Sequence, residues 1–321
     1  MNPTSCEFIA KDVHISRIDW TDTTFRITYN RSLGPLIHSI ETIGLQNSPV
    51  LQEIEGERFR IVAGWRRLRA LEKIGRKSVS CRIASIEDAE KDLFLFNFHE
   101  NIDRGFNPVE QSWAVNKLSA FMEEGKLVKD YLPWLNLPSK EEMITRYLTT
   151  SEISPIYWPA LFLGRLFPET IEMVFRDFRS LADPVFALFI FLHWGFQKQK
   201  EFLSDLREIG KRRSEDPALF FFSEPVADLL GQSTWTPQKK GEALRKLIRV
   251  CLFPTLTRVE KAFSETICHL NLDQRTRISP PPFFEGGRYG LEVQFSNPKE
   301  LKASLEKISL AVKQGKLDDL P

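Results

Sequence analysis

The sequence has only four cysteines, and no two of them form a C-x-x-C pair. Scattered thiols argue against a disulfide framework and a zinc site, and they favour a reducing compartment. A basic-then-apolar leader is also absent, and the most apolar run, Val185 to Trp194, is too short to span a bilayer. We therefore expect a cytoplasmic protein without a membrane span.

A strong excess of charge of either sign is absent as well. The 321 residues include 44 Lys and Arg against 43 Asp and Glu, which leaves a net charge of +1. The chain as a whole is therefore no polyelectrolyte, and any binding to nucleic acid needs local basic patches. The hydrophobic content of 42% suits ordinary globular cores, and the length allows two or three domains.

The first segment, residues 1–106, predicts a small α+β domain with a mixed sheet. Alternation of apolar and polar residues predicts strands, and a 3.6-residue apolar period predicts helices. Gly44 and Gly75 follow the two helices as C-terminal caps. The expected strands are 13–18, 49–54, 59–63 and 77–83, with helices over 33–43 and 65–74 and a further helix opening at Ser85.

The most informative stretch is the apolar strand that runs through Gly64 into a helix. Glycine permits a tight turn there, and the new helix presents unpaired backbone N–H groups that favour an anion. Arg66, Arg67 and Arg69 crowd the first turn, although the helix dipole disfavours cations at this end. The pattern predicts that a negative group, such as a phosphate, lies among these arginines. Taken alone, three arginines on one helix are also typical of a solvated face.

A second polar stretch, Glu100 and Asn101, follows the third helix of this segment. Carboxylate and amide oxygens suit Mg²⁺, which takes one or two protein ligands and leaves the rest to phosphate and water. Arg104 is a further candidate for phosphate contact. A frayed helix end is the alternative interpretation of Glu100 and Asn101.

Together these stretches resemble a known family. The sequence from Gly64 to Ala70 resembles the G-E-R-R-x-R-A box of ParB-type partition proteins, and Glu100 to Glu110 resembles their E-N-x-x-R-x-x-L-N-P-x-E box. Ser39-Ile40, Gly44 and Pro49-Val50 resemble the upstream S-I-x-x-x-G…P-[IV] segment. The order and spacing hold over residues 13–120, and the chain is identified as a divergent member of the ParB/RepB-like family.

The resemblance implies a ParB/sulfiredoxin-like fold that binds CTP with Mg²⁺ and closes a dimer on DNA. Matching positions assign phosphate contact to Gly64, Arg66 and Arg67, metal and triphosphate contact to Glu100 and Asn101, and a weaker phosphate contact to Arg104. The implied partners are DNA, a second copy of the chain and a partition ATPase. The implied location is the nucleoid.

The sequence departs from the family pattern in two places. Trp65 replaces the glutamate of the first box, and the spacing from Gly44 to Pro49 is one residue longer than expected. Both departures bear on CTP hydrolysis, so a weak CTPase activity stays open. The alternatives are a ParB-fold nuclease or phosphotransferase with Glu100 as its acid or metal group, and a protein-binding adaptor without nucleotide turnover. No cysteine lies near Gly64, which excludes sulfiredoxin chemistry.

The second segment, residues 107–235, predicts a mainly helical domain. Asn107, Pro108 and Glu110 form a strong helix start. The resemblance implies a helix-turn-helix over residues 127–147, where Lys140 and Arg146 are the candidate DNA contacts. The stretch is poor in small and basic residues, which indicates a degenerate DNA reader.

The third segment, residues 236–321, begins with the most basic helix of the chain and ends in a small strand-helix element. A basic amphipathic helix can bind phosphate backbones without sequence preference, although an ordinary solvated helix face is the favoured interpretation. By family analogy, the last element is a dimerisation site. The candidate DNA contacts on the basic helix are Lys239, Lys240, Arg245, Lys246 and Arg249.

Overall fold

The computed structural model describes residues 7–318 and 320–321, so Cys6 lies outside the described part. The chain divides into two compact units, which we describe separately. Unit 1 runs to residue 190 and includes residues 194–196, whereas unit 2 comprises residues 191–193 and 197–321. The borders at residues 106 and 235 fall inside these units, and the three-domain division stays a prediction.

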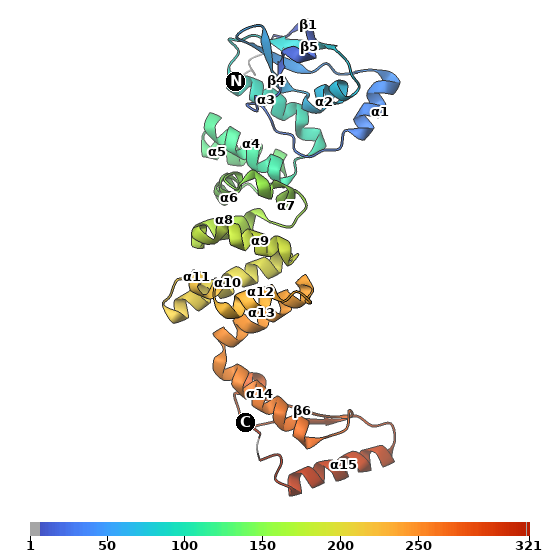
Figure 1. Ribbon diagram of the computed structural model, residues 1–321, viewed down its shortest axis with the longest axis vertical. Helices are drawn as coiled ribbons and strands as arrows, with labels where there is room; N and C mark the ends of the chain where they lie inside the picture. The colour runs from blue at the N-terminus through green and yellow to red at the C-terminus, as the bar shows by residue number, and fades with distance from the viewer. Residues whose placement is uncertain (1–6, 319) are drawn as a thin grey trace. The chain divides into compact units, whose positions relative to one another are not determined.

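Unit 1 begins with the mixed sheet that contains β1, β4 and β5 in Figure 1. Its five strands have the order β1-β5-β3-β4-β2. β3 and β4 form the expected antiparallel hairpin, while β3 pairs with β5, and β4 with β2, in parallel. The α+β fold with a mixed sheet is thereby confirmed. The strands are β1 (Ile9–His14), β2 (Ile18–Asp19), β3 (Val50–Ile54), β4 (Arg58–Ala63) and β5 (Ser78–Ala84).

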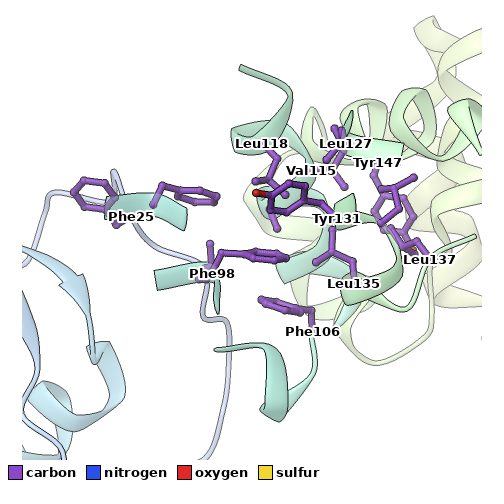
Figure 2. Close-up of a cluster of buried hydrophobic side chains, with 14 of the residues drawn as sticks. Phe25, Phe98, Phe106, Val115, Leu118, Leu127, Tyr131, Leu135, Leu137 and Tyr147 are labelled. Atoms are coloured by element: carbon purple, nitrogen blue, oxygen red, sulfur yellow. The ribbon is translucent and has the colours of Figure 1, made fainter. Parts of the chain in front are cut away.

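Side chains alternate across this sheet and feed two hydrophobic clusters. Ile61 belongs to the cluster that α1 (Gly34–Ile43) and α2 (Trp65–Lys73) complete, whereas the next residue, Val62, belongs to the other cluster. That second cluster takes Phe98 from α3 (Glu90–Asn101) and Val115 from α4 (Pro108–Phe121) (Figure 2). One continuous core therefore joins the sheet domain to the first helices after it.

Two helix starts in unit 1 test the sequence reasoning. Asn107 caps α4 as expected, since its side chain accepts from the backbone N–H of Val109 and Glu110 and the Glu110 side chain accepts from the N–H of Asn107. The helix expected to open at Ser85 begins five residues later, at Glu90. The Ser85 N–H donates to the Asp88 carboxylate at 2.8 Å, so this polar motif closes a turn and starts no helix.

The rest of unit 1 is helical. Between α4 and α6 lie a short α-helix, a π-helical turn over Leu127–Tyr131 and a 3-10 turn over Pro133–Leu135, and Asn136 then adopts a left-handed conformation. Two helical stretches joined by a turn are present here, and a DNA-reading role for them stays a prediction. The helices are α5 (Glu124–Lys126), α6 (Glu141–Ser151), α7 (Trp158–Phe162), α8 (Pro168–Asp177) and α9 (Ala182–Phe191), the last of which ends at the border between the units.

Unit 2 is helical up to a small two-stranded sheet, in which β6 and β7 pair antiparallel. The expected strand-helix element at the C-terminal end is present. None of the helices in the described residues combines the length and apolarity that crossing a bilayer requires. Its elements are α10 (Phe196–Arg213), α11 (Pro217–Phe221), α12 (Glu224–Gly231), α13 (Pro237–Leu252), α14 (Pro254–Leu270), β6 (Thr276–Ser279), β7 (Gly290–Val293) and α15 (Pro298–Lys313).

Candidate phosphate-binding site

Gly64 stands between β4 and α2 in a left-handed conformation, with φ of 95°. A Cβ at this position would lie 3.0 Å from Cβ of Pro49 and 3.1 Å from Nε of Arg67. Glycine is therefore required both by its backbone angle and by the close approach of its neighbours. The same conformation leaves the first N–H groups of α2 without a side-chain cap, as an anion-binding helix start needs.

Arg67 brings the two sequence boxes together. Its Nη1 donates to the backbone oxygens of Asn47 and Ser48 at 3.0 and 3.4 Å, and its Nη2 donates to Oε2 of Glu100 at 2.8 Å. Arg82 of β5 approaches Oε1 of the same carboxylate at 3.5 Å. Glu100 of α3 thus lies beside the α2 start and holds two guanidinium groups there.

Arg66 points to a different part of the site. Its Nη2 donates to the backbone oxygen of Ser32 at 2.7 Å, while its buried Nε has no hydrogen-bond partner among the described residues. Burial lowers the pKa of Arg66, and the nearby positive charge of Arg31 lowers it further. A cavity of about 390 Å³ adjoins this side chain and is lined by Asn30, Arg31, Ser32, Pro35, Arg66, Asn107 and Phe162.

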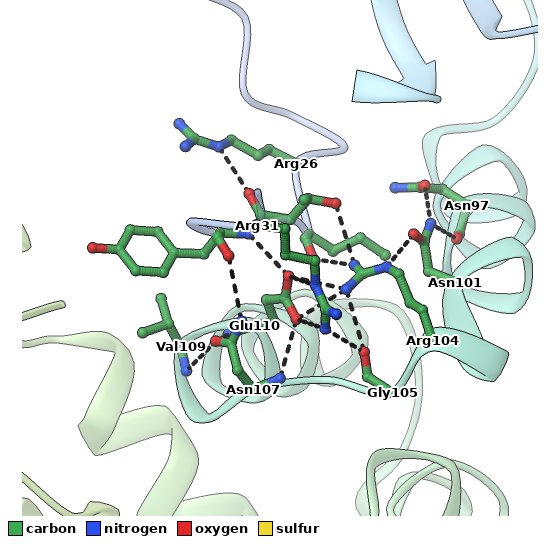
Figure 3. Close-up of polar contacts among 12 residues, drawn as sticks. Arg26, Arg31, Asn97, Asn101, Arg104, Gly105, Asn107, Val109 and Glu110 are labelled. Carbon is green, nitrogen blue, oxygen red and sulfur yellow. Dashed lines mark hydrogen bonds and ion pairs between the residues drawn. The ribbon is translucent and has the colours of Figure 1, made fainter. Parts of the chain in front are cut away.

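Asn101 and Arg104 belong to a network inside the chain (Figure 3). Nδ2 of Asn101 donates to the backbone oxygen of Asn97 at 2.7 Å, and its Oδ1 accepts from Nε of Arg104 at 2.5 Å. Every nitrogen of the Arg104 guanidinium donates a hydrogen bond within the chain. Besides Asn101, the acceptors are Gly105 O, both carboxylate oxygens of Glu110, Ile27 O and Thr28 Oγ1. The geometry favours a structural role for Arg104, and its contact with phosphate stays a prediction.

Glu110 is the centre of that network. Its side chain is fully buried and accepts from Arg31 at 2.8 and 3.1 Å, from Arg104 at 3.0 Å and from the backbone N–H of Tyr29 at 2.9 Å. Burial by itself raises the pKa of Glu110, but the hydrogen bonds from Arg31 and the charge of Arg104 outweigh it and leave the pKa below its ordinary value. Glu110 is therefore ionised and fixes the 27–31 strap to α4.

A metal ion would find few protein ligands at this site. In the described part of the chain, no three side chains of His, Cys, Asp or Glu converge into a metal-binding group. Both oxygens of Glu100 face arginines, and the amide oxygen of Asn101 faces Arg104. One carboxylate and one amide still fit Mg²⁺, which is commonly held by one or two protein ligands and by the phosphates that it accompanies.

Trp65 packs as an aromatic residue in place of the carboxylate expected from the resemblance. Its ring meets Trp20 edge-on at 6.2 Å and lies under the Arg26 guanidinium at 5.7 Å. Its Nε1 is buried and has no hydrogen-bond partner in the part of the chain that the structure describes. No acidic group is therefore supplied by this first helical position.

Most candidate DNA contacts are engaged inside their own unit. Arg146 pairs with Glu172 at 2.7 Å in unit 1, and in unit 2 Arg245 pairs with Glu201 at 2.9 Å and Arg249 with Glu260 at 2.6 Å. The exposed Lys140 lies 3.9 Å from Glu142. These acids reduce the charge that the basic side chains offer to a phosphate backbone.

The α13 lysines differ strongly from one another. Lys240 is buried, and its Nζ donates to the backbone oxygen of Leu230 near the end of α12, where a cation satisfies a free carbonyl. Lys239 lies over the ring of Trp235 at 4.5 Å. Among the described residues, no ion pair or hydrogen bond engages Lys246. An unbroken basic face over all five residues of this helix is thus absent, because the fold turns Lys240 inward.

Comparisons with known proteins bear directly on this arrangement. Residues 7–101 match the family model of the ParB N-terminal domain. These residues form a ParB N-terminal domain. The match covers the sheet, Gly64 and Glu100, so the resemblance drawn from the two boxes is confirmed.

One curated relative of this ParB N-terminal domain is the probable chromosome-partitioning protein ParB of Chlamydia muridarum (strain MoPn / Nigg). It is 34% identical over 100 residues, and the match spans 29% of this chain and 35% of the relative. About a third of the relative's length is therefore matched.

Similar solved structures are also ParB proteins. A C-terminally truncated Caulobacter crescentus ParB complexed with CTP-gamma-S is 18% identical, covering 55% of this chain and 98% of that one with a TM-score of 0.26. The same protein complexed to the centromeric parS site is 14% identical, covering 55% and 91% with a TM-score of 0.31. A Pnob8-like ParB-N domain is 13% identical, covering 65% and 98% with a TM-score of 0.39.

Three residues of the site were missed by the sequence reasoning. Arg31, Ser32 and Arg82 lie in the strap before α1 and on β5, far in sequence from both boxes. Arg31 stands in a polar stretch without periodicity, and Arg82 is an alternating residue on a strand. No local signal separates either from an ordinary solvated arginine.

Proposed function

We propose that the chain is a DNA-binding partition protein of the ParB type, regulated by CTP and Mg²⁺ at the Gly64–Glu100 site. The observation that carries the proposal is an uncapped helix start in a ParB N-terminal domain, with Arg67 beside Glu100 and Arg66 beside the adjoining cavity. An anion is favoured there by the helix dipole and by guanidinium groups that can form paired hydrogen bonds. That one related structure is a complex with a CTP analogue, and another a complex with parS, fits the same assignment.

In this proposal the nucleotide replaces internal contacts of the ligand-free chain. A triphosphate competes with Glu100 for Arg67 and supplies the missing partner of Arg66 Nε. The cavity beside Arg66 offers room for the rest of the nucleotide. Glu100 and Asn101 would then hold Mg²⁺, which screens the negative charge of the phosphates.

Calorimetric titration with CTP, ATP and GTP, with and without Mg²⁺, tests the assignment. We expect selective, Mg²⁺-dependent binding of CTP that Arg67→Ala weakens at least tenfold. Arg76→Ala is the matched control, because Arg76 is an exposed arginine just beyond the end of α2. Equal affinities of the two variants would remove Arg67 from the site, and Glu100→Ala should weaken only the Mg²⁺-dependent part of binding.

A second candidate, an adaptor that binds partners without nucleotide turnover, is favoured by Trp65. An aromatic residue at the first position of α2 supplies neither charge nor a general base to the phosphates. We therefore infer that any hydrolysis of CTP is slow. Release of phosphate at the rate of nucleotide exchange would contradict this inference.

DNA, a second copy of the chain and a partition ATPase complete the proposed set of partners, and the nucleoid is the proposed location. Lys239, Lys246 and Lys140 are the best remaining candidates for DNA contact. The other candidates are engaged, because Arg146, Arg245 and Arg249 pair with acids and Lys240 is buried. The readout is retention of the protein on closed circular DNA with and without CTP. Retention on DNA that is the same with and without CTP would show that the nucleotide does not control DNA binding.

A further inference from the structure

A second pocket in unit 1 has a chemistry distinct from the Gly64 site. It encloses about 210 Å³ between the segment of residues 23–26, α4 and the start of α7. Two indoles form one corner, since Trp113 and Trp158 meet at 4.9 Å with their planes 76° apart. The complete lining is Thr23, Arg26, Trp113, Asn116, Lys117 and Trp158.

Arg26 is the unusual member of this lining. Its guanidinium lies over the rings of both Trp65 and Trp113, at 5.7 and 5.4 Å. Nε donates to Thr28 O at 3.4 Å (Figure 3), whereas no hydrogen bond or ion pair to the described residues engages either Nη. A half-buried cation held by two rings and one carbonyl oxygen has lost hydration without gaining a counter-ion. An anion from outside the chain would supply it.

The other lining residues also favour an anionic ligand. Lys117 adds a second cation, and its own partner, Glu90, lies at 3.3 Å on α3 and is not part of the lining. No acidic side chain lines the pocket. Asn116 and Thr23 offer hydrogen-bond donors and acceptors of the kind that the edge of a heterocyclic ring requires.

The size limits the ligand to one ring. Pockets for drug-sized ligands enclose roughly 300–1,000 Å³, so this pocket is smaller than the lower end. Aromatic side chains bind nucleobases by their faces, and basic side chains beside them bind the attached phosphate. We propose that the Trp113–Trp158 pocket binds one nucleotide unit, with its base against the indoles and its phosphate on Arg26 and Lys117.

The unit could be a free mononucleotide or one nucleotide of a single strand, and the experiment separates these sources. The full chain is titrated with dAMP, dCMP, dGMP and dTMP, with an eight-nucleotide single strand and with a hairpin duplex, each by calorimetry. All titrations are repeated in the Arg67→Ala background, which weakens binding at the Gly64 site. We expect binding of a monophosphate or of the single strand to persist there.

Asn116→Asp is the decisive variant, because Asn116 is exposed and a carboxylate there repels an anion without disturbing the core. We expect at least a tenfold loss of affinity. Ala120→Glu is the control, since it adds the same charge to an exposed position of α4 outside the pocket. Lys117→Gln should lower the affinity severalfold, with Lys91→Gln, an exposed lysine of α3, as its control.

Three outcomes would overturn the proposal. The first is absence of binding by all six ligands. The second is binding that Asn116→Asp and its control weaken equally, and the third is binding that disappears in Arg67→Ala, which would place the ligand at the Gly64 site. Monophosphate binding without strand binding identifies a free nucleotide as the source, and the reverse identifies single-stranded DNA.

Discussion

At the scale of single residues, Glu110 is the most constrained carboxylate of unit 1. It is fully buried and is surrounded by two guanidinium groups and two backbone N–H donors. Replacement by an uncharged residue leaves the partly buried Arg31 and Arg104 without their counter-ion. Breaking such a pair costs more than the pair itself contributes, because the remaining charge is desolvated.

We predict that Glu110→Gln lowers the stability of unit 1 by about 3–5 kcal/mol. Thermal unfolding followed by tryptophan fluorescence measures this, since six of the seven tryptophans lie in unit 1. Glu142→Gln, which changes an exposed carboxylate 3.9 Å from Lys140, is the control and should change stability by less than about 0.5 kcal/mol.

The same carboxylate gives the stability of unit 1 a pH dependence. The pKa of Glu110 in the folded chain is below its unfolded value, so its contribution is complete above the unfolded pKa and disappears as pH falls through the folded pKa. We expect the wild type to lose stability below about pH 4.3, and Glu110→Gln to lose less over that range. If the stability of the two proteins falls with pH in parallel, Glu110 is not the source of the pH dependence.

Gly64 offers a prediction with a close internal control. An alanine at a left-handed position costs about 1–2 kcal/mol of backbone energy, and at Gly64 its Cβ would also collide with Pro49 and Arg67. Gly56 has a similar positive φ of 76° with no atom near the added Cβ. Gly64→Ala should therefore destabilise the chain more than Gly56→Ala and should alone weaken CTP binding. Melting temperatures and CTP titrations of both variants provide the comparison.

At the scale of elements, the start of α4 combines a cap with the Glu110 network. Asn107→Ala removes two hydrogen bonds to the first turn of α4, and such a cap contributes about 1 kcal/mol. Thr236→Ala removes the single cap contact of α13 in unit 2. We expect Asn107→Ala to cost more than Thr236→Ala and to weaken CTP binding, because it loosens Glu110 and the wall of the Arg66 cavity. If the two variants lose the same free energy of unfolding in urea, the α4 cap is independent of the Glu110 network.

α15 buries a mixed face. Ser304 and Ala311 are buried, and Leu301 and Ile308 on the same side of the helix are partly buried. Ser304 also donates to Asp273 at 3.0 Å. Leu305, Leu310 and Val312 are left at least half exposed.

At the scale of the whole molecule, the exposed apolar residues of α15 argue for the proposed dimer. Phe283 and Leu291 of the same C-terminal element are also exposed, at 77% and 52%. Soluble chains seldom leave so many large apolar groups together in water. We predict that Leu305→Lys with Val312→Lys, on one side of α15, converts a dimer to a monomer in analytical ultracentrifugation, whereas Ala303→Lys on the opposite, exposed side does not. A dimer that survives both substitutions would move the interface elsewhere.

The sequence alone determined the local elements of this protein. Gly64 between a strand and a helix, the β3–β4 hairpin and the Asn107 cap are all set by groups within a few residues of each other. Backbone freedom and short-range hydrogen bonds act at that range, so the pattern predicts them well. The two boxes likewise predicted the ParB N-terminal domain, because their order and spacing match that family.

Only the tertiary structure decided which charged groups have partners. Arg67 meets Glu100 from 33 residues away, and Arg31 meets Glu110 from 79 residues away. Lys240 lies one turn before Leu244 on the buried face of α13, but only the end of α12 supplies the carbonyl oxygen that its Nζ reaches. An unpaired charge costs little free energy in water and much when it is buried, so the role of a charged side chain depends on the neighbours that folding provides. Those neighbours are distant in sequence, and local patterns do not specify them.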